Sequence, residues 1–233
     1  MQRRFISNAS HELSTPLTVI SSQLEVSLQR ERSAEEYKKV MESIYQDVQH
    51  LNKLTQTLLE FAKASGNHGG LEIDLIRIDE IILELPAAVA KIDALYTVKI
   101  EFDDLPDEDE SLLVFGNKPL LFTAISNIVV NACKYSDDHQ AIVKLQVLEN
   151  EVNIDVVDHG RGIDDSDIEK IFQPFYRTTE SRREVGFGLG LSLAHRIIKI
   201  HKGNIDVHSE INKGTSFHIK LPAAKSLKGL SKF

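Results

Sequence analysis

His11 lies in a segment whose apolar residues are spaced as in a packed helix. Ile6, Leu13 and Ile20 recur every seven residues, which places them along one stripe. At 100° per residue, His11 lies roughly 150° from the centre of that stripe and is expected to face solvent. An exposed neutral imidazole can act as a nucleophile, although an ordinary surface histidine is the simpler alternative.

Two neighbours of His11, Glu12 and Pro16, favour the chemical role. Glu12 could orient the imidazole and accept its proton while the other ring nitrogen reacts. Pro16 has no N–H to donate to the carbonyl of Glu12, a helix distortion that costs roughly 3 kcal/mol. Thr15 follows His11 by one turn on the same face. The sequence therefore predicts a distorted helix that presents a nucleophile.

A second predicted helix, over 118–135, carries a polar stripe opposite its apolar face. Asn127, Asn131 and Lys134 share this stripe. A carboxamide oxygen can bind Mg²⁺ without adding negative charge beside phosphates, and a lysine can offset phosphate charge. The alternative is an ordinary solvated helix face.

Two glycine-rich segments follow this helix. A strand over 152–158 ends at Asp158, whose carboxylate can accept a hydrogen bond from an adenine amino group, and Gly160 and Gly162 let the backbone approach a ring. Residues 186–192 bring glycines to the start of another helix, an environment suited to phosphate oxygens. A tight turn would explain either segment alone, but the three elements in this order predict a site for ATP with Mg²⁺.

The elements that position these residues fall into two parts. Residues 1–65 predict a helical hairpin with a break at 30–33. The second helix has an apolar stripe too wide to be buried within one hairpin, so we expect a homodimer that forms a four-helix bundle. The alternative is that the hairpin packs against its own second domain.

The rest of the chain predicts an α/β sandwich with a mixed sheet and helices on one face. Its expected bounds are 71–222, after a glycine-rich hinge at 66–70 and before a frayed C-terminal tail at 223–233. The acidic residues 103–110 are expected to form a solvated loop. Strands are predicted near 71–78, 97–103, 141–149, 152–158, 204–209 and 215–221, and helices near 79–94, 118–135, 166–172 and 189–201.

Composition narrows the class of protein. The formal net charge of −8 argues against sequence-independent nucleic-acid binding, and the single Cys133 excludes an internal disulfide and is expected to pack in a core. The histidines lack partners at metal-ligand spacing, so no zinc site is expected. No apolar run is long enough to span a bilayer, so we expect a cytoplasmic chain whose only membrane link would be a missing upstream segment.

The segment Ser10-His11-Glu12-Leu13-x-Thr15-Pro16-Leu17 resembles the phosphoacceptor box of the HisKA class of sensor histidine kinases, with Ser14 where the family usually carries a basic residue. The later elements resemble the N, G1, F and G2 boxes of the GHKL ATPases, with Gly116-Asn117 in place of the more common Gly-Asp. The resemblance implies ATP-dependent phosphorylation of His11 and transfer to an aspartate of a response-regulator receiver domain. It also implies a phosphatase activity through Glu12-x-x-Thr15.

The resemblance also implies roles for individual residues. Asn131 would be the chief Mg²⁺ ligand with help from Asn127, Asp158 would read adenine, and 176–188 would form a mobile lid. The other implied nucleotide-binding residues are Lys134, Tyr135, Gly160, Gly162, Phe175, Arg177, Gly186, Gly188, Leu189, Gly190 and Thr215.

Two rival functions share parts of this pattern. A GHKL ATPase that drives a conformational clamp would share Asn131 and Asp158 but has no reason to carry the His11 box. A degenerate kinase that serves only as a scaffold would be expected to lose Asn131 or the glycine-rich segment. Both features are present in this chain.

Overall fold

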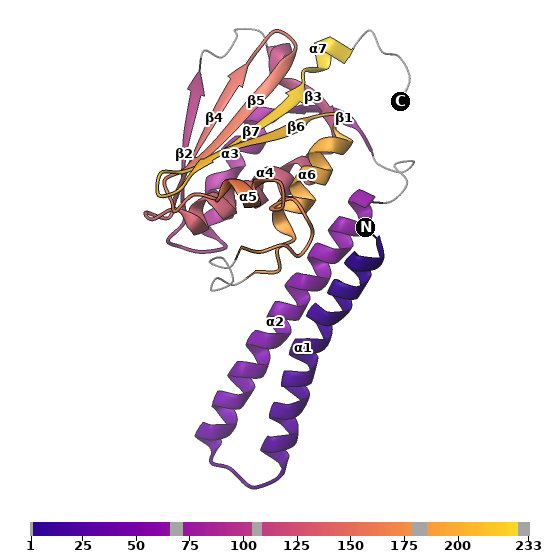
Figure 1. The fold of residues 1–233 in the computed structure, drawn as a ribbon, viewed down its shortest axis with the longest axis vertical. Coiled ribbons are helices and arrows are strands. Elements are labelled where there is room, and N and C mark those ends of the chain that lie inside the picture. Colours follow the sequence, from indigo (N-terminus) through magenta and orange to yellow (C-terminus); the bar gives the residue numbers. More distant parts are fainter. Residues whose placement is uncertain (1, 66–71, 104–108, 179–185, 228–233) are drawn as a thin grey trace.

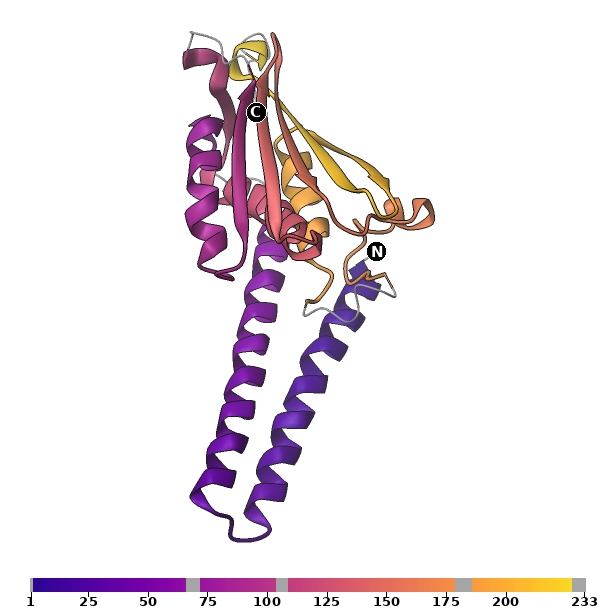
Figure 2. The same cartoon turned by 90° about the vertical axis from the view of Figure 1, so that its left-hand side faces the viewer.

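Two long antiparallel helices, α1 (Gln2–Leu28) and α2 (Ala34–Ser65), form a hairpin that extends from an α/β domain (Figure 1). The computed structural model describes residues 2–65, 72–103, 109–178 and 186–227. Figure 2 shows α2 continuing beneath the helices of the α/β domain, while the N-terminal end of α1 lies to one side of it. The predicted hairpin with its break near residue 30 is confirmed.

The second helix of the hairpin begins with a capping box. The backbone N–H of Glu36 donates to the Ser33 hydroxyl (3.2 Å), and the Glu36 carboxylate accepts from the Ser33 N–H (2.9 Å). Both bonds satisfy N–H groups that have no partner inside a helix. The hydrogen bond from Ser33 holds the pKa of Glu36 below its ordinary value. The chain direction therefore reverses in a short, well-specified turn.

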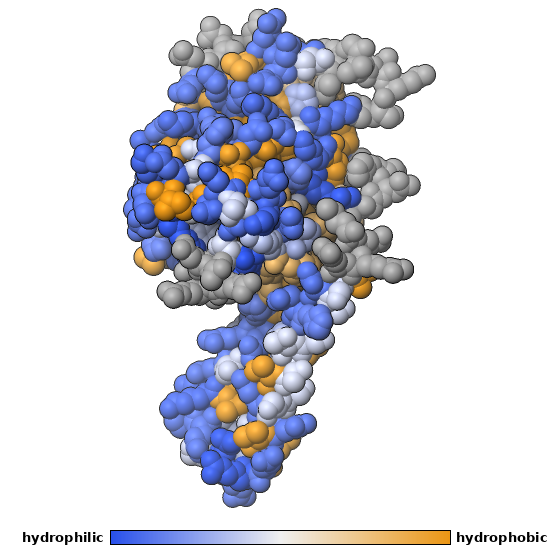
Figure 3. All heavy atoms as spheres, viewed as in Figure 1, coloured by the Kyte–Doolittle hydropathy of each residue, from blue (hydrophilic) through white to orange (hydrophobic). Residues whose placement is uncertain are grey.

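The hairpin leaves much apolar surface uncovered within one chain. Leu54 is fully buried, but Leu17 is 53% exposed, Met41 59% and Tyr45 65%. Figure 3 shows apolar side chains on the lower part of the hairpin in the face that it presents. Exposed apolar area of this kind indicates a surface for a partner.

The α/β domain contains two sheets. The main sheet has the strand order β2-β4-β5-β7-β6, in which β2 and β4 are parallel and the other neighbours antiparallel, and a small sheet pairs β1 with β3. The predicted mixed sheet is confirmed, and Figure 1 shows it in front of α3, α4 and α6. The strands are β1 (Asp74–Arg77), β2 (Thr97–Asp103), β3 (Leu113–Gly116), β4 (Gln140–Val147), β5 (Glu151–Asp158), β6 (Asn204–Glu210) and β7 (Gly214–Pro222). The helices are α3 (Ile78–Ala90), η1 (Asp109–Leu112), α4 (Lys118–Tyr135), α5 (Asp165–Ile168), α6 (Gly190–Ile200) and α7 (Ala224–Leu227).

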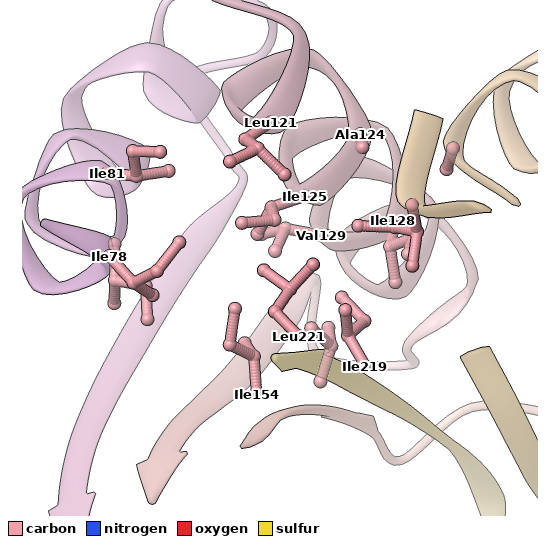
Figure 4. Packing of buried hydrophobic residues seen from close by; sticks show 14 of the residues in the cluster. Ile78, Ile81, Leu121, Ala124, Ile125, Ile128, Val129, Ile154, Ile219 and Leu221 are labelled. Atoms are coloured by element: carbon pink, nitrogen blue, oxygen red, sulfur yellow. The ribbon is translucent and has the colours of Figure 1, made fainter. Parts of the chain in front are cut away.

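The helix α4 is the centre of the core. Ile125, Ile128 and Val129 are fully buried, and Figure 4 shows them against Ile154 and Ile219 of the main sheet. Full burial of such a side chain contributes roughly 1.5–3 kcal/mol. The opposite, polar side of α4 is therefore held rigidly.

Cys133 lies on the buried side of the same helix. It is fully buried, as predicted, and its thiol donates to the carbonyl of Thr97 (3.3 Å). Burial raises the pKa of Cys133 to about 11. The thiol is therefore protonated and inert at neutral pH.

The strand β3 and the helix α5 differ from the sequence predictions. The strand β3 was not predicted, because its four residues are too short for a periodic pattern and its partner β1 is distant in the chain. The helix near 166–172 ends at Ile168, since Pro174 disfavours helix before it and the Tyr176 hydroxyl donates to Asp167 (2.7 Å), which folds this segment back.

The C-terminal residues 223–227 were expected to be frayed, which is wrong. Ala223 and Ala224 are buried, and α7 packs beside β3. The N–H of Ala223 donates to the Asn150 carbonyl (3.0 Å). The prediction failed because two small alanines between a proline and a lysine do not form a recognisable pattern of buried apolar residues.

Several other predictions concern residues that the structure does not describe. These are the hinge at 66–70, most of the acidic loop, most of the lid and the tail after 227. No helix of the described part of the chain is both long and apolar enough to cross a bilayer.

Candidate functional site: a cavity between α4 and the glycine-rich segment

One cavity of about 730 Å³ gathers most of the predicted nucleotide-binding residues. Its lining comes from α4, the end of β5, the glycine-rich segment before α6, and α2. The predicted residues along it are Asn127, Asn131, Lys134, Tyr135, Asp158, Gly162, Arg177, Gly186, Gly188, Leu189, Gly190 and Thr215. Segments far apart in the sequence therefore meet at one place.

The polar side of α4 faces this cavity. Asn117 caps the helix by accepting a hydrogen bond from the N–H of Leu120 (3.1 Å), which assigns a structural role to a residue for which none was predicted. The carboxamides of Asn127 and Asn131 line the cavity, and they make no hydrogen bond with any residue of the described part of the chain. Amide groups that line a cavity with their hydrogen-bonding capacity unused suit a polar ligand.

Asp158 lines the cavity and is 4% exposed. One of its carboxylate oxygens accepts from the N–H groups of Gly160 (3.0 Å) and Thr215 (3.2 Å). Burial raises the pKa of Asp158 above its ordinary value, and these two hydrogen bonds oppose the rise. The carboxylate is therefore fixed in position and can accept a hydrogen bond from a ligand.

Two glycines shape the walls. A Cβ at Gly160 would lie 1.9 Å from the carbonyl oxygen of Tyr135, so only glycine allows this close approach of β5 to the end of α4. Gly188 has a φ of +68°, and its carbonyl accepts from the N–H of Phe175 (2.9 Å). The glycine-rich segment is thus tied to the segment that follows α5.

Two of the predicted nucleotide-binding residues lie beside the cavity rather than along it. Gly160 packs under the end of α4, and Phe175 packs against Phe5 of α1, with ring centroids 5.5 Å apart. Phe5 in turn stacks on Phe61 of α2 at 4.7 Å. Phe175 therefore joins the α/β domain to the hairpin.

The structure does not bring His11 into this cavity. His11, Glu12 and Thr15 are exposed on α1, as the periodicity predicted for His11, and no described residue of α1 lines the cavity. The Thr15 hydroxyl donates to the His11 carbonyl (3.0 Å), which places it one turn below the imidazole. The predicted nucleophile and the cavity are on separate surfaces in this arrangement.

Sequence reasoning missed several residues of the cavity. Arg161 lies 4.7 Å from the ring centroid of Tyr135, and His50, Lys53 and Thr57 of α2 line the side opposite α4. The spacing of the last three indicates that they share a face of the helix. It does not indicate that the face meets another domain.

Comparison with known proteins identifies both parts of the chain. The family model of the His Kinase A (phospho-acceptor) domain matches residues 1–67, and that of the histidine kinase-, DNA gyrase B- and HSP90-like ATPase matches residues 116–225. The chain is 32% identical to the signal transduction histidine-protein kinase ArlS of Staphylococcus epidermidis, over 95% of this chain and 48% of ArlS. It is 31% identical to the sensor histidine kinase HprS of Escherichia coli, over 94% of this chain and 47% of HprS.

Solved structures share the fold. Histidine kinase ThkA in complex with response regulator protein TrrA has a TM-score of 0.74 at 22% identity, covering 95% of this chain and 61% of that chain. Acinetobacter baumannii histidine kinase AdeS has a TM-score of 0.70 at 21% identity, covering 92% of this chain and 98% of that chain.

This chain spans about half the length of the curated relatives that it matches. A phosphoacceptor domain followed by an ATPase domain of this kind is the core of a sensor histidine kinase, and the chain belongs to that family.

Proposed function

We propose that this chain binds ATP in the cavity and transfers the γ-phosphoryl group to His11. The observation that carries the proposal is the cavity itself, in which two unpartnered carboxamides, a buried carboxylate and a glycine-rich segment face the same space. These groups match the phosphates, the adenine amino group and the metal of Mg·ATP. The family membership of both parts of the chain supports the same function.

Asp158 would accept a hydrogen bond from the adenine amino group, while Lys134 and the glycine-rich segment would contact the phosphates. The oxygen donors of Asn131 and Asn127 fit Mg²⁺, which would neutralise phosphate charge when bound. Positioning and neutralisation are most of what phosphoryl transfer requires from a protein.

In the transfer step, a ring nitrogen of His11 forms a bond to the γ-phosphorus as the bond from phosphorus to the ADP oxygen breaks. The proton on the other ring nitrogen passes to Glu12, which leaves a neutral phosphorylated imidazole. Because His11 lies outside the cavity of its own chain in this arrangement, transfer within one chain requires the α/β domain to move relative to α1. Both transfer within one chain and transfer to the dimer partner are compatible with this step.

Incubation with Mg²⁺ and γ-labelled ATP tests this proposal. We expect protein-bound label that survives base and is lost in acid, and we expect His11→Gln to abolish it while leaving ATP binding intact. His208→Gln, which changes an exposed histidine on β6 outside the cavity lining, is the matched control and should label normally. Acid-labile label retained in His11→Gln would overturn the assignment.

The proposal includes the partners and location expected from the sequence. The chain would act as a homodimer on the cytoplasmic side of the membrane, where ATP is available, and would pass phosphate to a response-regulator receiver domain. The matched phosphoacceptor domain supports this, and the relative ThkA is seen with a response regulator.

A second activity, dephosphorylation of the phosphorylated regulator, is favoured by the place of Thr15. Its exposed hydroxyl lies one turn from His11 and could orient a water molecule towards a docked phosphoaspartate. We expect Thr15→Ala to slow dephosphorylation of a receiver domain that this chain has phosphorylated. Thr18→Ala is the matched control, since its exposed hydroxyl makes the same type of bond to the Ser14 carbonyl (2.9 Å). Equal rates for Thr15→Ala and the unmodified chain would exclude this role.

A further inference from the structure

The helix α2 forms one wall of the cavity. His50, Lys53 and Thr57 line it together with Asn127 and Asn131 of α4. Because these α2 residues are three and four positions apart, they project from one side of the helix. A ligand in the cavity therefore lies between the α/β domain and the hairpin of the same chain.

This wall is held in place by direct contacts. The His50 ring lies edge-on to the Phe187 ring, with centroids 4.3 Å apart and planes at 64°. Phe187 lies in the glycine-rich segment, so α2 packs against the part of the cavity suited to phosphates. Further along α2, the carbonyl of Ala64 accepts from the Arg196 side chain (2.8 Å).

The cationic side chains that line the cavity differ in their contacts with other protein groups. The Arg161 guanidinium and the Lys134 ammonium lie over the Tyr135 ring, at 4.7 Å and 5.1 Å from its centroid. Arg177 donates to the carbonyl of Gly186 (2.7 Å). Lys53 makes no side-chain hydrogen bond or ion pair with any residue that the structure describes. Its ammonium is available to an anionic ligand.

We propose that Lys53 is a phosphate-binding residue of the nucleotide site, so that bound ATP bridges the α/β domain and α2. This inference rests on the proposed binding of ATP in the cavity. An ammonium beside a polyphosphate forms a charge-assisted contact, for which lysine is well suited. The contact belongs to the arrangement in which His11 of the same chain is outside the cavity, and in this proposal it breaks before phosphoryl transfer.

That order of events has a kinetic signature. An interaction made in the bound ground state but absent from the transition state lowers both the half-saturating ATP concentration and the maximal rate. Removing it raises both by the same factor and leaves their ratio unchanged. A residue that held phosphate during transfer would instead reduce the ratio.

The test compares Lys53→Gln and Lys53→Glu with Lys39→Gln. Lys39 lies on the same face of α2 two heptads earlier, is exposed, and does not line the cavity. Titration calorimetry with a non-hydrolysable ATP analogue should show affinity at least fivefold weaker for Lys53→Gln, weaker still for Lys53→Glu, and unchanged for Lys39→Gln. Adenosine, which has no phosphate, should bind all four chains equally.

Labelling of His11 supplies the second readout. We expect Lys53→Gln to raise the half-saturating ATP concentration and the maximal labelling rate together. Unchanged affinity for the ATP analogue, an equal loss of adenosine binding, or a fall in the ratio of the two labelling parameters would overturn the inference while the unmodified chain still binds ATP and labels His11. An unmodified chain that fails to bind the analogue would overturn the proposed function itself.

Discussion

Asp158 combines two properties that rarely occur together on a protein surface: it is almost completely buried, and it borders an open cavity. Burial favours the protonated form, while a hydrogen bond to an adenine amino group requires the carboxylate. In the proposed nucleotide site, proton binding and nucleotide binding at Asp158 would therefore oppose each other.

This opposition predicts a pH dependence. Since the pKa of Asp158 is raised, affinity for the ATP analogue should fall on acidification at a higher pH than for an aspartate with the ordinary value of 3.8. In Asp158→Asn the amide oxygen is expected to keep the hydrogen bonds from Gly160 and Thr215, so the NH2 group, a donor, replaces the oxygen that would accept from adenine. Loss of a hydrogen bond to a charged group, about 1.5–3 kcal/mol, weakens binding roughly ten- to hundredfold. Calorimetric titrations across pH should show a steeper slope for the unmodified chain than for Asp158→Asn, because protonation of the ligand contributes equally to both. Equal slopes would contradict the assignment.

Residue types and spacing predicted much of the candidate site, because Asn127 and Asn131 stand out on a helix where asparagine is a poor choice. They did not predict the wall made by His50 and Lys53. The heptad pattern of α2 indicates which residues face the hairpin partner, but the place where another domain docks depends on contacts between distant segments. Nor did the sequence assign Asn117 its capping role.

At the scale of elements, α4 carries both the core and the site. Its apolar side is buried against β5 and β7, and its polar side faces the cavity, so packing on one side sets the geometry on the other. The sequence predicted its bounds correctly because 18 residues provide five turns of unbroken periodicity. The strand β3 and helix α7 are four residues each and gave no such signal.

Truncation of a buried α4 side chain tests whether this helix is the centre of the domain's stability. Ile128→Ala is expected to lower the free energy of unfolding by about 2–5 kcal/mol, because it removes buried methyl groups and leaves a cavity. Leu83→Ala on α3, where the side chain is 59% exposed, should change it by less than about 0.5 kcal/mol. Urea titrations at fixed protein concentration provide the comparison. Similar losses in the two variants would show that α4 is not the stability centre.

At the scale of the whole molecule, the hairpin is incomplete on its own. Leu24 and Met41 remain 41% and 59% exposed although they lie on helices that pack against each other. A second hairpin would cover them and produce the four-helix bundle expected from the sequence. The alternative, in which the hairpin is covered by its own α/β domain, does not apply to these residues, because the described part of that domain leaves them exposed.

Charges placed on this surface should separate the dimer. Sedimentation equilibrium is expected to give twice the 26.2 kDa mass of one chain for the unmodified protein. The double variant Leu24→Glu/Met41→Glu should give the mass of one chain, because glutamates buried across an interface without partners are costly. Leu83→Glu on α3 is the control and should remain dimeric, and circular dichroism should show unchanged helicity. A dimeric double variant with normal helicity would place the interface elsewhere.

Cys133 is the only cysteine of the chain, and its thiol is buried with a pKa of about 11. Any cysteine introduced on the surface is therefore the sole site that a maleimide reagent modifies in the folded protein, with no need for a cysteine-free background. A pair placed on α1 and on the α/β domain would carry spin labels or fluorophores. Distances between such labels would report, molecule by molecule, whether His11 moves relative to the cavity of its own chain.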